Sequence, residues 1–190
     1  MAGNKRKEEK FLYLLPKEAI DFIEKSYKIK NNNGLFWEII FYGGLRISEG
    51  LNIIPNDIQS QNNIIMIKTL KQKKEKKDYV LYPKEIVEKL IMYIDKNKIS
   101  KNKLIFPFSR QWAWKQFKTV LHQMGLSNLY SPHSLRHAHG LAVRDATHDP
   151  MAVAKRLRHR SLKNTTFYMH LTEEDNQKII NYLKEIKKNG

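Results

Sequence analysis

Residues that favour β-strands are gathered in one stretch of this 190-residue chain, residues 57–82. Within it, two apolar runs at 64–67 and 79–82 flank a lysine-rich turn, a pattern that predicts a β-hairpin. Almost everywhere else the apolar residues recur at helical spacing. The sequence therefore predicts an α+β fold that is mainly helical and carries a small antiparallel β-sheet.

Prolines and glycines mark where the helices begin and end. Ser131-Pro132 and Asp149-Pro150 each place a capping residue before a proline, which is a strong helix start. We find no internal repeat and no second core, so we expect a single domain over residues 11–190 after a flexible basic lead-in over residues 1–10. The expected helices cover residues 15–27, 35–42, 45–51, 83–95, 110–124, 132–146, 150–157 and 172–186.

Composition indicates a folded and strongly basic domain. The chain has 35 Lys and Arg against 19 Asp and Glu, a formal net charge of +16, and 41% of its residues are hydrophobic. Such a domain is expected to bind a polyanion; nucleic acid is the commonest one, and an anionic membrane surface is the alternative. No apolar run approaches the ~20 residues that span a bilayer, and no signal peptide is evident. The lack of cysteine excludes disulfides and thiol chemistry, which fits a cytoplasmic location.

The segment 132–137 places His133, Arg136 and His137 at positions i, i+3 and i+4, which predicts that they share one helix face. A cation fixed beside an imidazole suits a site that holds a phosphate oxygen and moves a proton. A solvated basic face is the plainer alternative. A metal site that includes His139 is a weaker one, because no nearby carboxylate completes a ligand set, so we expect no metal.

Two further segments carry residues suited to phosphate chemistry. Arg46 follows a glycine pair and sits between apolar residues, so we expect it to be half-buried and paired with Glu49 or with a bound phosphate. The segment 157–170 contains His159 and Tyr168 among basic residues. A tyrosine can act as a covalent nucleophile, although its ordinary pKa of about 10 requires nearby cations. Most tyrosines in such surroundings are simply core or surface residues.

Together and in this order, these segments resemble the tyrosine recombinase family, which includes phage integrases and chromosome-dimer resolvases. The family carries an arginine in a G-L-R-x-S-E segment, a lysine on a β-hairpin, an H-x-L-R-H segment, and a nucleophilic tyrosine nine residues after a late histidine. The resemblance covers about residues 12–172. The matching positions in this chain are Arg46, Glu49, His133, Leu135, Arg136, His137, His159 and Tyr168.

The chain departs from the family pattern at three points. Arg158 stands where the family usually has glycine before its late histidine, so either a sharp turn is removed or a DNA contact is added. Gly50 stands where an apolar residue is common. Family members usually have an N-terminal core-binding domain, and residues 1–33 are too short for it, so we expect that domain to be absent.

The resemblance implies a role for each matching residue. Arg46 and Arg136 would hold the scissile phosphate, with Glu49 and His137 in support. Tyr168 would attack phosphorus to give a 3′-phosphotyrosyl link, and His133 and His159 would assist. No cofactor is implied. The hairpin lysine that protonates the 5′ oxygen is ambiguous: counting forward from Ile64 favours Lys71 and counting back from Val80 favours Lys73, which we prefer.

Two basic clusters are expected to contact the DNA backbone, although a solvated surface would look the same in sequence. Double-stranded DNA is the expected partner and no membrane is. Because the tail of family members often docks on a neighbouring protomer, we expect a homo-oligomer, dimer or tetramer, on nucleoid DNA of a bacterium, archaeon or mobile element. A type IB topoisomerase and a non-catalytic DNA-binding protein are the alternative functions. The expected DNA contacts are Lys68, Lys74, Lys76, Lys77, Lys155, Arg156, Arg158, Arg160 and Lys163.

Overall fold

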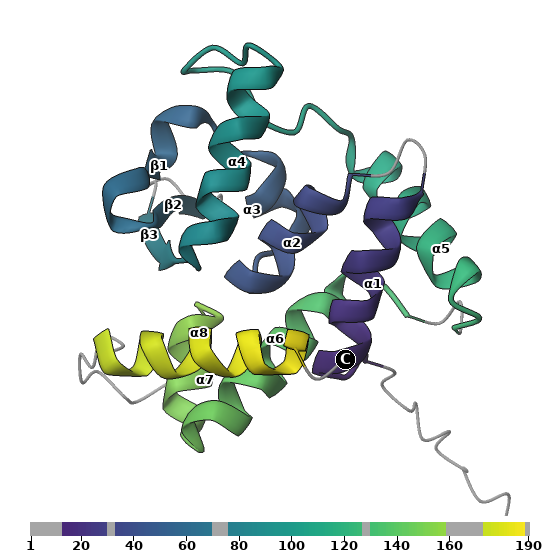
Figure 1. Cartoon of the computed structure of the whole chain (residues 1–190), viewed down its shortest axis with the longest axis vertical. Coiled ribbons are helices and arrows are strands. Elements are labelled where there is room, and N and C mark those ends of the chain that lie inside the picture. The colour runs from purple at the N-terminus through teal and green to yellow at the C-terminus, as the bar shows by residue number, and fades with distance from the viewer. Residues whose placement is uncertain (1–12, 30–32, 70–75, 127–129, 159–172, 189–190) are drawn as a thin grey trace, which may run out of the picture.

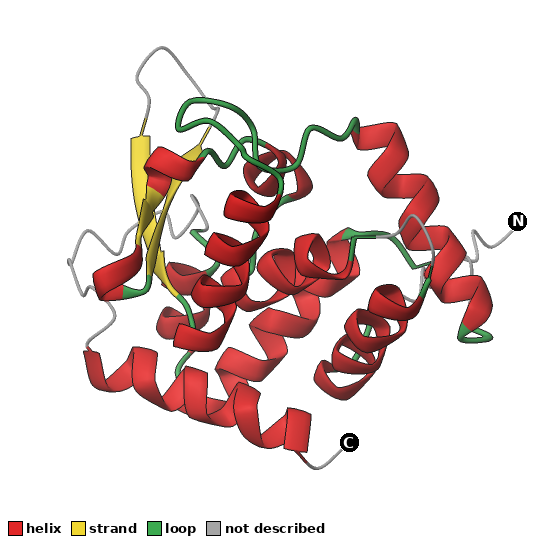
Figure 2. Ribbon diagram, turned by 45° about the horizontal axis from the view of Figure 1, so that its top comes forward, coloured by secondary structure: helices red, strands yellow, loops and turns green. Residues whose placement is uncertain are grey.

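A computed structural model describes residues 13–29, 33–69, 76–126, 130–158 and 173–188 of the chain. These residues form a mainly helical fold with a small antiparallel sheet at one edge, as the sequence predicts (Figures 1 and 2). The elements in chain order are α1 (Pro16–Lys28), α2 (Gly34–Gly43), α3 (Ile47–Leu51), η1 (Pro55–Asp57), β1 (Ile58–Gln59), η2 (Ser60–Asn62), β2 (Ile64–Thr69), β3 (Lys76–Leu81), α4 (Lys84–Lys96), α5 (Arg110–Gln123), α6 (His133–Thr147), α7 (Pro150–Arg156) and α8 (Glu173–Lys188).

The sheet contains the predicted hairpin, β2–β3, and a third strand that the sequence does not reveal. β1 is only two residues long, too short to show a strand pattern, and it pairs antiparallel with β2. In the hairpin, Ile65 lies opposite Val80. Ile65, Ile67 and Val80 are buried whereas Tyr79 is exposed, so one face of the sheet covers the core and the other faces solvent.

Helix α2 lies at the centre of the fold and is buried along its whole length, packed against α1, α4 and α6 (Figure 1). The Asn33 side chain caps its first turn by accepting a hydrogen bond from the Phe36 amide at 3.0 Å. Trp37 packs edge-on against Phe22 of α1, with ring centroids 5.7 Å apart. Because α2 is enclosed on every side, it fixes the position of the turn that follows it, and that turn carries the candidate site.

Candidate functional site

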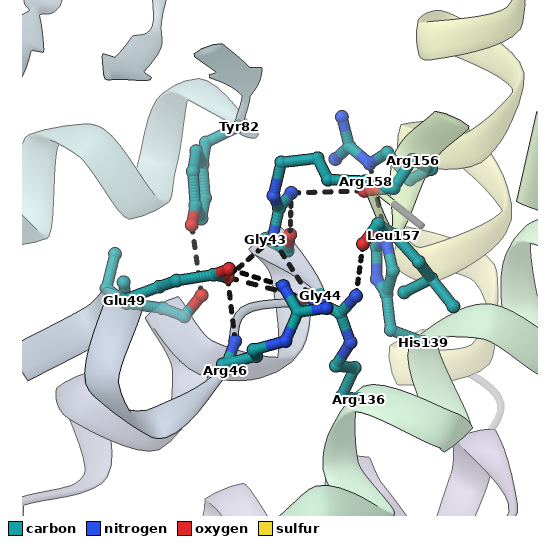
Figure 3. A network of polar contacts seen from close by, with 11 residues as sticks. Gly43, Gly44, Arg46, Glu49, Tyr82, Arg136, His139, Arg156, Leu157 and Arg158 are labelled. Carbon is teal, nitrogen blue, oxygen red and sulfur yellow. Dashed lines mark hydrogen bonds and ion pairs between the residues drawn. The ribbon is translucent and has the colours of Figure 1, made fainter. Parts of the chain in front are cut away.

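The buried carboxylate of Glu49 lies among three arginines, which come from three segments of the chain (Figure 3). Arg46 Nη1 lies 2.7 Å from Glu49 Oε1, and Arg158 Nη2 lies 2.9 Å from Oε2. Arg136 Nη1 lies 3.7 Å from Oε2. Although burial opposes ionisation, the charge of Arg158 and hydrogen bonds from Arg46 and Arg158 lower the pKa of the Glu49 carboxyl. Three guanidinium groups around one carboxylate leave an excess of positive charge.

The glycine pair after α2 makes this arrangement possible. A Cβ on Gly43 would lie 1.9 Å from the Tyr82 hydroxyl oxygen, and one on Gly44 would lie 2.5 Å from Cδ2 of His139. Gly44 also has a φ of 55°, in the left-handed region that glycine adopts freely. The end of α2 can therefore approach α6 and the end of the hairpin closely, which brings the turn beside the arginine of α6.

Arg46 is half-buried, as predicted, and 41% of its side chain is exposed. Of the two partners predicted for it, Glu49 is the one that the structure shows. The Arg46 amide also donates to Glu49 Oε2 at 2.9 Å, which caps the start of α3. Helix α3 consequently begins at Ile47, two residues later than the expected start at 45, because the backbone at Gly44 and Arg46 is not helical.

Arg136 is 2% exposed and is held by backbone oxygens. Its Nη1 donates to the Gly44 carbonyl at 2.6 Å, and its Nη2 donates to the Leu157 carbonyl. Burial, with repulsion from Arg46 and Arg158, lowers the pKa of the Arg136 guanidinium to about 10, so it stays charged at neutral pH. The side chain thus ties α6 to the turn after α2 and to the end of α7.

The two histidines of the H-x-L-R-H segment lie on the exposed side of α6, with ring centroids 4.8 Å apart. The prediction of one shared face holds for His133 and His137, whereas the Arg136 side chain is buried. Partial burial and the Arg136 charge lower the pKa of the His137 imidazole. His139, the third histidine of the metal alternative, is buried and accepts a hydrogen bond from Arg156.

The structure corrects both expectations for Arg158, namely that it removes a sharp turn or that it adds a DNA contact. The sharp turn is retained, because Arg158 has a φ of 53°. Its side chain is 8% exposed and is bound to Glu49 and to the Gly43 and Gly44 carbonyls, so it is not part of the exposed basic surface that the sequence predicts. In the sequence, the one signal of this buried position was that Arg158 stands where the family has glycine.

The prediction that Arg156 lies on an exposed DNA-binding surface is also corrected, because its side chain is 4% exposed. It donates to the Tyr42 and Leu81 carbonyls at 3.1 and 3.0 Å and to His139 Nε2 at 3.3 Å. Burial and three neighbouring arginines lower the pKa of the His139 imidazole well below its ordinary range, which keeps it neutral and able to accept this bond. Arg156 therefore joins α7 to α2, α6 and the end of the hairpin instead of facing a ligand.

Of the remaining predicted residues, some are described by the structure and the others lie outside the described ranges. Lys68 of β2 is 3.4 Å from Asp57, and Lys155 of α7 is half-buried. The backbones of Lys76 and Lys77 belong to β3, opposite Thr69 and Lys68. The residues outside the described ranges are Lys71, Lys73, Lys74, His159, Arg160, Lys163 and Tyr168.

Two general findings concern the described part of the chain. Within it, no group of three or more His, Asp or Glu side chains is placed to hold a metal ion. Among the same residues, no helix combines the length and the apolar character needed to cross a membrane.

Known proteins resemble this chain in sequence and in structure. Tyrosine recombinase XerH of Campylobacter jejuni is 30% identical over 173 residues, which cover 86% of this chain and 48% of that protein. XerH of Helicobacter pylori is 28% identical over 90% of this chain and 48% of its own length. The crystal structure of XerH bound to difH substrate, a pre-cleavage complex, has a TM-score of 0.68 and 25% identity, covering 78% of this chain and 47% of that one.

The fold is that of a tyrosine recombinase catalytic domain, with its arginines gathered on one buried carboxylate. The chain belongs to the phage integrase family, whose model matches residues 13–175. It spans about half the length of the curated relatives that it matches.

Proposed function

We propose that this chain is the catalytic domain of a site-specific recombinase that cuts and rejoins duplex DNA through a 3′-phosphotyrosyl intermediate. The observation that carries the proposal is the cluster of Arg46, Arg136 and Arg158 around the carboxylate of Glu49. Its excess positive charge and fork-shaped donors suit the non-bridging oxygens of a phosphodiester. Membership of the phage integrase family supports the same chemistry.

In the proposed reaction, Arg46 and Arg136 stabilise the charge that develops on the phosphate oxygens. The Tyr168 oxygen attacks phosphorus, so a tyrosyl O–P bond forms while the bond from phosphorus to the 5′ oxygen breaks. A hairpin lysine protonates the departing oxygen, and His133 assists the proton movement at the tyrosine. His159 donates a hydrogen bond to the phosphate. Attack by a 5′-hydroxyl on the phosphotyrosyl bond rejoins a strand without ATP.

The two arginines proposed to bind the phosphate differ in how exposed their side chains are. Arg46 is 41% exposed, so an incoming phosphate can reach it directly. Arg136 is buried and held by the Gly44 and Leu157 carbonyls, so we expect DNA binding to uncover it. The carbonyls fix the guanidinium plane in advance, which reduces the ordering that the reaction requires.

Covalent trapping tests the proposed function. A duplex nicked close to the cleavage site loses the short 5′-hydroxyl strand by diffusion, so a phosphotyrosyl adduct should accumulate and migrate as a protein–DNA band on a denaturing gel. A topoisomerase would also relax supercoiled DNA that lacks any recombination site. Failure of every duplex tested to give an adduct, with DNA binding retained, would favour a non-catalytic DNA-binding protein.

The proposed assembly is a dimer or tetramer on DNA. Family resemblance suggests that the C-terminal helix docks on a neighbouring protomer, yet in this structure α8 packs against α6 and α1 of its own chain. Its apolar residues Ile179 and Leu183 are fully buried there, and Lys184 bonds Glu85 of α4 at 2.9 Å. We therefore propose that α8 is released from its own chain when protomers assemble on DNA in the nucleoid.

The general acid is proposed to be Lys73, with Lys71 as the second candidate. A 5′-bridging phosphorothiolate separates them, because sulfur departs without needing a proton. Cleavage of this substrate by Lys73→Ala should recover to nearly the unsubstituted rate, whereas cleavage of ordinary DNA stays impaired. Lys71→Ala is the matched control and should show weaker DNA binding without such recovery. Recovery only in Lys71→Ala would reverse the assignment. If neither variant shows recovery and both still cleave ordinary DNA at the unsubstituted rate, neither lysine is the general acid.

A further inference from the structure

Arg158 has a backbone conformation that an L-amino acid adopts only at a cost. Its φ of 53° lies in the left-handed region, and it immediately follows Leu157, the C-cap of α7. Glycine adopts this conformation without strain. The Nε of Arg158 is also buried and has no acceptor among the described residues. Strained backbone is enriched at functional sites, and an unsatisfied buried donor needs an explanation, so Arg158 is a candidate for a role beyond stability.

The Arg158 guanidinium shares its acceptors with the arginines of the proposed phosphate site. Its Nη2 donates to Glu49 Oε2 at 2.9 Å, the same oxygen that accepts from the Arg46 amide. The same Nη2 donates to the Gly44 carbonyl at 3.1 Å, where Arg136 also donates. Its Nη1 donates to the Gly43 carbonyl at 3.3 Å (Figure 3).

We propose that Arg158 is a positioning residue of this site, which fixes the Glu49 carboxylate and the Gly43–Gly44 turn and thereby sets the geometry of Arg46 and Arg136. The proposal rests on the proposed function and adds to it a residue that acts through others. Without Arg158, Glu49 keeps Arg46 as its close partner and Arg136 as its distant one, so the carboxylate can draw either arginine away from the phosphate. A displacement of about 1 Å can cost on the order of 10²-fold in rate.

Arg158→Gly is the decisive variant, because glycine suits the backbone conformation while the guanidinium is lost. Under single-turnover conditions with saturating nicked duplex, we expect the rate constant of adduct formation to fall on the order of 10²-fold. The dissociation constant for DNA should change by less than about threefold, because the buried side chain contributes little surface contact. Lys98→Gly is the matched control: Lys98 is exposed with a φ of 51°, so this change relieves similar strain and should leave the rate unchanged.

The pH profile distinguishes positioning from mere support of the fold. Among the described residues, Glu49 is paired with Arg46 at the N-cap of α3, with Arg136 of α6 and with Arg158, and its charge also acts on the Tyr82 phenol that follows β3. Since Arg158 lowers the pKa of Glu49, its removal raises that pKa. The carboxylate then protonates at higher pH, and the acid limb of the rate profile should move to higher pH. Arg158→Lys restores a charge without the fork and should return the limb towards its original position.

The outcomes separate this inference from the proposed function. No adduct from the unsubstituted protein would refute the function itself. Adduct formed at an unchanged rate with an unchanged acid limb in Arg158→Gly would refute the role of Arg158 alone. If Arg158→Gly proves unfolded by circular dichroism, the Arg158→Lys variant decides, because lysine restores the charge but not the fork. A folded lysine variant that forms adduct at the unsubstituted rate also overturns the proposal.

Discussion

Replacing Tyr168 with phenylalanine is expected to abolish covalent attachment to nicked DNA and to leave DNA affinity nearly unchanged. The substitution removes only the oxygen that would attack phosphorus, while the charges that bind the backbone remain. A denaturing gel measures the adduct and an equilibrium binding titration measures the affinity. The expected loss of adduct exceeds about 10³-fold, since removal of the nucleophile leaves no side chain at that position able to form the bond.

Tyr79 supplies the matched control for this prediction. It is exposed on β3, so Tyr79→Phe removes a hydroxyl from a solvent-facing tyrosine and should leave adduct yield unchanged. Adduct formed at normal yield by Tyr168→Phe would refute the assignment. The next tyrosines to test would then be Tyr79 itself, Tyr130 and Tyr182.

Arg136→Lys is expected to lower the rate constant of adduct formation by about 10²–10³-fold, the range seen when one preorganised donor to a developing oxyanion is removed. Lysine keeps the positive charge but cannot reproduce the planar fork that bonds the Gly44 and Leu157 carbonyls together. Single-turnover cleavage at saturating DNA measures the rate, and thermal unfolding shows how much of the loss comes from the fold.

Arg144→Lys is the matched control on the same helix. Its side chain is 59% exposed and pairs with the adjacent Asp145 at 2.7 Å, so we expect the rate to stay within about twofold, because an exposed ion pair contributes little. An Arg136→Lys enzyme that cleaves as fast as the unsubstituted protein would show that this guanidinium does not act on the phosphate. Equal losses in both variants would point to general backbone binding instead.

The structure suggests why these arginines are stable without DNA. A buried guanidinium needs partners, and here they are one carboxylate and several main-chain carbonyls. Carbonyls satisfy donors without cancelling the charge, so the cluster keeps its positive excess. Among the residues that the structure describes, Glu49 is the carboxylate that pairs with Arg46, Arg136 and Arg158.

Local chemistry made much of this protein predictable from its sequence. The hairpin followed from two apolar runs around a lysine-rich turn, and the starts of α6 and α7 followed from Ser131-Pro132 and Asp149-Pro150. These signals depend on residues a few positions apart, so no knowledge of the fold was needed. The short strand β1 was missed because its pairing with β2, rather than its own two residues, defines it.

The burial of charge was decided by tertiary structure alone. In sequence, Arg156 and Arg158 belong to a basic run that looks like a DNA-binding surface. In the fold, Arg158 bonds Glu49, 109 residues away, and Arg156 bonds the Tyr42 carbonyl, 114 residues away. A run of cations has the same composition whether solvent or protein surrounds it, because its environment is supplied by distant segments that only folding brings near. The sequence by itself therefore determined the helices, the hairpin and the order of the motifs, whereas the packing of α2, α6 and α7 decided which arginines are buried and which acceptors they bond.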